Sequence, residues 1–302
     1  MGLVVRRVEE DGYLRVERLG GVPERVLPGL QVVVINEVGE EILGVIATKA
    51  HHAVSPDEKY EVVPYEKLFI DIGVDSAEEV KALKIQIGAP VTYRPTLSRL
   101  QKHRVTGTAL DDRGGCVSLM ALVKALQADP ADATLVAVFS VQEEFNLRGA
   151  MVAANRVKPD CAISIDIMVA SDTPDLSTRG ELALGMGPSL GMYSFHGRGT
   201  LNGTLPHPVL LKHVVESAAK AGMPLQRSAH CGCLTDSSYV QLTGDGVPAI
   251  DIGYPARYTH TPIEVCDLRD IHSVAQLLEA VMRDFTPGFS FARKGPFDRY
   301  RS

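Results

Sequence analysis

The distribution of apolar residues divides the chain near residue 100. Up to that point, short runs alternate apolar with charged residues. Glycine, proline and asparagine separate these runs, as in LVVRRV, YLRVERL, LQVVVIN and ILGVIAT. Regular short runs of this kind predict β-strands joined by turns, in a small barrel or sandwich. One helix is predicted within SAEEVKAL, because Ser76 and Glu79 fit a capping box.

Beyond about residue 100 the pattern becomes that of an α/β domain. Continuous apolar runs predict strands buried on both faces, and apolar residues at helical spacing predict amphipathic helices. Alternation of the two predicts a mostly parallel sheet covered by helices. We therefore expect a β-barrel domain at 1–100 and an α/β domain at 101–302. The predicted strands include 134–141, 160–166 and 248–253, and the predicted helices are 113–126, 206–222 and 267–285.

Composition narrows the class of protein. The 302 residues are 45% hydrophobic and 23% charged, which is ordinary for a folded globular chain. The net charge of −6 gives no electrostatic support for nucleic-acid binding. Neither a signal peptide nor a membrane-spanning run is visible. Five scattered cysteines, an odd number, favour a reducing compartment, so we expect a cytoplasmic protein. We interpret Cys231 and Cys233 as inert thiols, because no second Cys/His pair follows at metal-site spacing.

Acidic residues and one histidine follow the predicted strands. The pairs Asp111-Asp112 and Glu143-Glu144 lie at two strand ends, Asp166 ends a third strand, and His260 follows a fourth. In open α/β sheets, ligands bind beyond the carboxyl ends of the strands, so these side chains are expected to gather at one edge. Each pair alone is usually a solvated loop; the placement of all of them directly after apolar strands is what indicates a site.

Such a set fits hydrolytic metal chemistry. Histidine nitrogens and carboxylate oxygens bind zinc, and a catalytic zinc keeps a position open for water. Two ions about 3.5–4 Å apart need a bridging carboxylate. A further carboxylate that does not bind metal is needed to accept the proton of the attacking water. Adjacent glutamates can divide the tasks of ligand and base.

These segments resemble a known family. TALDDRGGC, VQEEFNLRGA, SIDIMVASDTP and YPARYTHTP are similar to signature segments of the family-42 metallopeptidases, the tetrahedral or glutamyl-type aminopeptidases. Segments before residue 100 resemble the inserted barrel of that family, which is PDZ-like and mediates dimerisation. The resemblance covers nearly the whole chain. It implies a zinc-peptidase-like catalytic domain, hydrolysis of N-terminal residues from short peptides by a metal-activated water, and self-association, in this family as dodecamers.

Residue by residue, the resemblance implies these roles. Asp111 bridges two divalent ions, zinc or cobalt, and an unusual peptide bond joins it to Asp112. Glu144 and His260 complete one metal site. By the same resemblance, Glu143 is the general base and Asp166 is a ligand of the second ion. Asp236 supports the site or binds the substrate amine. Around Asp236 the match is looser, because Cys233-Leu234 stands where the family has Gly-Gly.

The sequence departs from the family at its beginning. The His-x-Asp motif that supplies the first metal ligand precedes the barrel in the family, whereas Met1 to Val5 resembles the stretch just after that motif. The second metal site would therefore lack its histidine, and His51 and His52 resemble a barrel loop rather than a replacement. We expect Met1 to be an internal methionine of a longer enzyme, with a truly shortened chain of weakened or lost activity as the alternative.

Other functions stay open at this stage. The chain would act as an assembly subunit or peptide-binding module if it were a non-catalytic relative, although retention of Glu143 favours an enzyme. A metal-dependent deacylase or carboxypeptidase would use the same chemistry. A glycosidase is disfavoured, because a metal-ligand set fits peptide hydrolysis better than a pair of carboxylates flanking a sugar bond.

Overall fold

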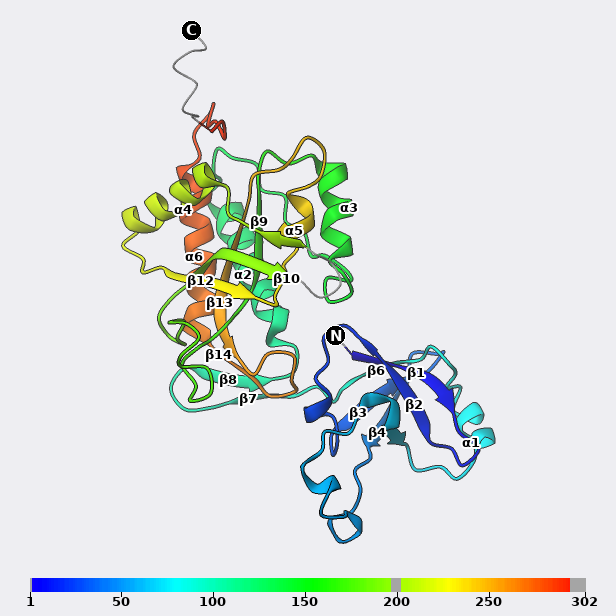
Figure 1. Cartoon of the computed structure of the whole chain (residues 1–302). Helices are drawn as coiled ribbons and strands as arrows, with labels where there is room; N and C mark the ends of the chain where they lie inside the picture. Colours follow the sequence, from blue (N-terminus) through cyan, green and yellow to red (C-terminus); the bar gives the residue numbers. More distant parts are fainter. Residues whose placement is uncertain (1, 197–201, 294–302) are drawn as a thin grey trace.

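The computed structural model describes residues 2–196 and 202–293, and Met1 lies outside them. Six strands close into an antiparallel barrel in the order β1-β2-β5-β4-β3-β6, and a separate eight-stranded sheet follows (Figure 1). The barrel strands are β1 Gly2–Val8, β2 Leu14–Leu19, β3 Gln31–Ile35, β4 Glu41–Ile46, β5 Phe69–Asp71 and β6 Pro90–Tyr93.

Apolar and polar residues alternate along the barrel strands, and the apolar ones fill the interior of the barrel. Leu14, Val32 and Ile70 are fully buried in its interior. Helix α1 (Ala77–Ala82) covers one end, and Ser76 caps it by accepting a hydrogen bond from the Glu79 amide, as predicted. Short 3-10 turns connect the strands: η1 Glu24–Val26, η2 His51–Ala53, η3 Glu58–Tyr60 and η4 Tyr65–Lys67.

The second sheet has the order β11-β10-β13-β14-β8-β7, with β9 beside β13 and β12 beside β10. It is mixed: β9 runs parallel to β13 and β12 parallel to β10, whereas hairpin-like neighbours such as β13 and β14 are antiparallel. Its strands are β7 Leu97–Arg99, β8 Arg104–Gly107, β9 Ala162–Val169, β10 Ser189–His196, β11 Asn202–Thr204, β12 Gln226–Cys231, β13 Ala249–Arg257 and β14 Glu264–Asp267.

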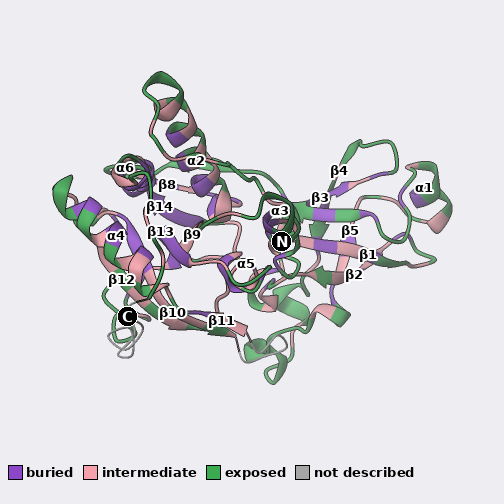
Figure 2. Ribbon diagram, turned by 90° about the horizontal axis from the view of Figure 1, so that it is seen from above, coloured by how far each residue is buried: buried purple, intermediate pink, exposed green. Residues whose placement is uncertain are grey.

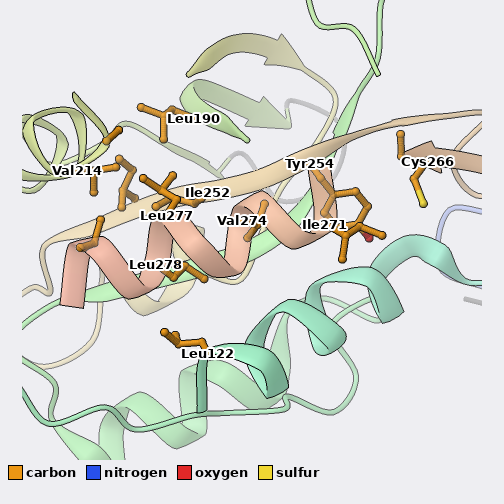
Figure 3. Close-up of a cluster of buried hydrophobic side chains, with 14 of the residues drawn as sticks. Leu122, Leu190, Val214, Ile252, Tyr254, Cys266, Ile271, Val274, Leu277 and Leu278 are labelled. Carbon is orange, nitrogen blue, oxygen red and sulfur yellow. The ribbon is translucent and has the colours of Figure 1, made fainter. Parts of the chain in front are cut away.

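Helices cover this sheet as the sequence pattern predicts. Figure 3 shows α6 against β13, with Leu277 and Ile252 in contact across the core and Leu122 of α2 below them. Burying each such side chain contributes about 1.5–3 kcal/mol to stability. Figure 2 shows the buried positions along the central strands and the inner faces of the helices. The helices are α2 Leu110–Ala128, α3 Arg148–Val157, α4 Pro208–Lys220, α5 Ser237–Val240 and α6 Leu268–Asp284.

The α/β class and the small barrel are thereby confirmed, and the sheet is mixed rather than mostly parallel. The barrel strands end at Tyr93 and the sheet begins at Leu97; the division into domains 1–100 and 101–302 stays a prediction.

The expected strand at 134–141 is a wrong prediction. This run forms no strand in the described part of the chain. Val136, Phe139 and Val141 are 51%, 52% and 70% exposed. An apolar run becomes a buried strand only where a neighbouring strand pairs with it. Within the described residues β9 pairs with β13 alone, so β9 does not pair with the 134–141 run.

Candidate metal centre

Three of the predicted residues converge from separate segments. Asp111 lies at the start of α2, Glu144 lies in the loop before α3, and His260 lies in the loop between β13 and β14. One ligand atom from each falls within 4.8 Å of the others. The Nε2 atom of His260 is 3.4 Å from Asp111 Oδ2 and 3.8 Å from Glu144 Oε2. Burial opposes the charged form of His260, but Asp111 and Glu144 outweigh it and raise its pKa to about 9.

Glu264, at the start of β14, holds two of these residues by their backbones. Its Oε2 accepts from the Asp111 amide at 3.0 Å and its Oε1 accepts from the His260 amide at 2.8 Å. The residue is 1% exposed, and burial raises the pKa of its carboxyl to about 7. Our sequence reasoning missed Glu264. The available signal was an acid at the first position of a buried strand, four residues after the histidine.

Glu143 lies beside this group in the loop that follows the 134–141 run. Backbone hydrogen bonds from Leu147 to the Glu143 carbonyl, at 2.8 Å, and from Gly149 to Val141, at 3.0 Å, hold the loop. Burial, and then repulsion from Glu144 and other acids, raises the pKa of Glu143 to about 8.

The Asp111–Asp112 peptide bond is cis, as the resemblance implied. Asp112 Oδ1 accepts from the Gly115 amide at 3.0 Å and lies 2.8 Å from the Tyr254 hydroxyl, which is 2.6 Å from the Leu110 carbonyl. Burial raises the pKa of Asp112 to about 8. Tyr254, fully buried on β13, is a second residue that our sequence reasoning missed.

Asp166 and Asp236 approach the same group from other elements. Asp166 Oδ1, on β9, accepts from the Ile167 amide at 2.7 Å. Burial, followed by repulsion from Asp111, Asp112 and Glu143, raises its pKa well above the usual range. Asp236 accepts a 2.7 Å hydrogen bond from Ser140, while its buried Oδ1 has no hydrogen-bond partner among the described residues. Among the described residues, neither belongs to the three-ligand group.

This arrangement fits a divalent cation. The ligand atoms in this group are carboxylate oxygens of Asp111 and Glu144 and an imidazole nitrogen of His260. Zinc and similar ions bind ligands of these types. Burial and mutual repulsion raise the pKa of Asp112, Glu143 and Asp166. A cation between such carboxylates offsets that repulsion and favours their ionised forms.

Other candidates from the sequence lie elsewhere. His51 and His52 are exposed on η2 of the barrel, outside the three-ligand group. All five cysteines are free thiols. No helix in the described ranges is long and apolar enough to span a membrane.

The chain is similar over most of its length to known proteins. The family model for M42 glutamyl aminopeptidases matches residues 1–277. The SgcX protein of Escherichia coli K12 is 37% identical over 281 residues, covering 93% of this chain and 75% of that protein.

Solved structures give the same assignment. An aminopeptidase from the archaeon Desulfurococcus kamchatkensis superposes with a TM-score of 0.87 at 35% identity, covering 95% of this chain and 77% of its own. The Pyrococcus horikoshii TET1 peptidase, described as assembling into a tetrahedron or a large octahedral shell, has a TM-score of 0.82 at 30% identity, covering 94% and 81%. These matches confirm the resemblance drawn from the sequence, and the chain belongs to the M42 glutamyl aminopeptidase family.

Proposed function

We propose that this chain is a metal-dependent aminopeptidase that removes N-terminal residues from short peptides. The observation that carries the proposal is the convergence of Asp111, Glu144 and His260, from three separate segments, to within 4.8 Å. The family description and the aminopeptidase names of its structural relatives support the reaction class. Five free cysteines support a reducing compartment, the cytoplasm, as the place of action.

Asp111, Glu144 and His260 would hold one divalent ion, zinc or cobalt. Such an ion would supply a Lewis acid for the scissile carbonyl and lower the pKa of water toward about 7. Asp111 and Asp166 would hold a second ion, for which these two carboxylates are the proposed ligands in this chain. We therefore expect the first site to bind more tightly than the second.

Two further carboxyls would act on the substrate. Glu143 would accept the proton of the attacking water at its carboxylate and return it to the departing amine. Asp236 would accept a hydrogen bond from the substrate's free amino group, because its buried Oδ1 has no partner within the part of the chain that the structure describes. Asp112 would support the site through its contact with Tyr254.

The alternative is a non-catalytic relative that serves as an assembly subunit or peptide-binding module. It would need no base beside the metal ligands, whereas Glu143 is adjacent to Glu144 in the sequence and within electrostatic reach of Asp111. This observation favours an enzyme over the alternative. A deacylase or carboxypeptidase is distinguished by its substrate.

The test combines turnover with metal content. We expect release of the N-terminal residue from unblocked aminoacyl-anilides, loss of turnover after chelation, and recovery with Zn²⁺ or Co²⁺. N-acetylated peptides should not react. His260→Ala should lower bound metal measured by elemental analysis. Unchanged stoichiometry of one ion per chain in this variant would contradict the ligand assignment, and turnover of blocked peptides alone would contradict the reaction class.

A further inference from the structure

The barrel touches the imidazole of His260. Gly21 lies between β2 and η1, and its carbonyl oxygen is 2.7 Å from His260 Nδ1, across 239 positions of sequence. A carbonyl oxygen only accepts hydrogen bonds, so Nδ1 must carry the hydrogen. In the neutral ring, the lone pair is then on Nε2, the nitrogen that faces Asp111 and Glu144.

The backbone of His260 is also held, and again partly by the barrel. The Tyr93 hydroxyl, at the end of β6, donates to the His260 carbonyl at 3.3 Å. Glu264 accepts from the His260 amide on the other side. His260 has a positive φ of 67°, a conformation that a non-glycine residue keeps when its surroundings fix it. Contacts from two parts of the molecule therefore define both the backbone and the ring of this residue.

The approach at Gly21 leaves no room for a side chain. A Cβ atom on Gly21 would lie 2.8 Å from His260 Nδ1 and 3.0 Å from Cε1. Any larger residue would push the ring away from the carbonyl, or push the barrel away from the β13–β14 loop that carries His260. Either movement alters the direction of Nε2 toward Asp111 and Glu144.

We propose that the barrel is a working part of the metal site, with Gly21 and Tyr93 as positioning residues that orient His260. The carbonyl of Gly21 selects the tautomer with its lone pair on Nε2, and Tyr93 fixes the loop that carries the ring. This gives the barrel a role beyond assembly. The inference rests on the proposed function insofar as His260 binds the ion.

The test measures metal binding without relying on turnover. We expect Gly21→Ala to weaken Zn²⁺ binding about 10–100-fold in competition with a chelator, the usual effect of losing a hydrogen-bond partner of a metal-binding histidine. The visible absorption of the Co²⁺-loaded protein should also change, because it reports the ligand arrangement. Tyr93→Phe, which keeps the ring in the barrel, should weaken Zn²⁺ binding roughly 2–10-fold through loss of one hydrogen bond.

A matched control separates positioning from general damage to the barrel. Gly29 lies in a turn with φ of +87°, and a Cβ there would meet no atom of the described residues within 4 Å. Gly29→Ala should therefore destabilise the barrel while leaving Zn²⁺ affinity and the Co²⁺ spectrum unchanged. Wild-type Zn²⁺ affinity in both Gly21→Ala and Tyr93→Phe would overturn the proposal. If the wild type binds Zn²⁺ but does not turn over peptides, the proposed function fails while these binding measurements still test the inference.

Discussion

At the scale of single residues, the positions of the proposed ligands depend on hydrogen bonds between side chains and backbone groups. Glu264 joins the amides of Asp111 and His260, so one buried carboxylate fixes the spacing of two proposed ligands. Gly21 fixes the ring of His260 from the opposite side. Both carboxylate oxygens of Glu264 are used in these hydrogen bonds and Gly21 has no side chain, and neither residue belongs to a motif that we recognised in the sequence.

Glu143 offers the sharpest test at this scale. Glu143→Gln keeps the size and hydrogen-bonding capacity of the side chain but cannot accept a proton. We expect kcat on an unblocked peptide to fall roughly 10²–10⁴-fold, with metal content and fold unchanged in the same preparation. A Glu143→Gln protein that binds metal and keeps near-normal kcat would show that Glu143 is an ordinary loop acid.

At the scale of elements, an ion pair ties the loop after β9 to the end of β13. Arg257 Nε and Nη2 donate to Asp172 at 2.7 Å and 2.6 Å, and the Leu184 amide donates to the same carboxylate at 3.0 Å. Burial opposes the charged carboxylate, but these donors outweigh it and lower the pKa of Asp172 from its usual 3.8. The pair therefore holds the 170–184 loop against the sheet.

This lowered pKa gives a pH prediction with a definite sign. A depressed folded-state pKa contributes stability that is present above about pH 4 and is lost as pH falls through the folded value. Asp172→Asn should reduce stability by about 1–3 kcal/mol at pH 6. The difference between the two proteins should shrink below pH 4. Thermal melting of both from pH 6 to pH 3 measures this, and a constant difference throughout would refute the assignment.

At the scale of the whole molecule, the barrel projects a long loop between β4 and β5 (Figure 1). Tyr60, Val62 and Val63 on this loop are 85%, 44% and 42% exposed. Exposed apolar groups of this kind mark interaction surfaces. They motivate the prediction that the protein self-associates through residues 1–100.

We therefore expect light scattering at micromolar concentration to show oligomers. Tyr60→Lys should reduce the apparent mass, because a charge is costly to bury in an interface. Leu242→Lys serves as control, because Leu242 is exposed and lies outside the barrel, just after α5. This variant should leave the apparent mass unchanged. A monomeric wild-type protein would count against association through the barrel.

The sequence by itself predicted most of the elements, and it predicted the acids and the histidine that the fold brings together. Helical spacing predicted α4 and α6, a continuous apolar run predicted β13, and the positions of acids directly after apolar runs marked Asp111 and Glu144. These features depend on neighbours in the chain. The tertiary structure decided which distant groups meet. Gly21 reaches His260 only because the barrel packs beside the β13–β14 loop, and the 134–141 run is not a strand because a strand requires a partner supplied by the rest of the fold.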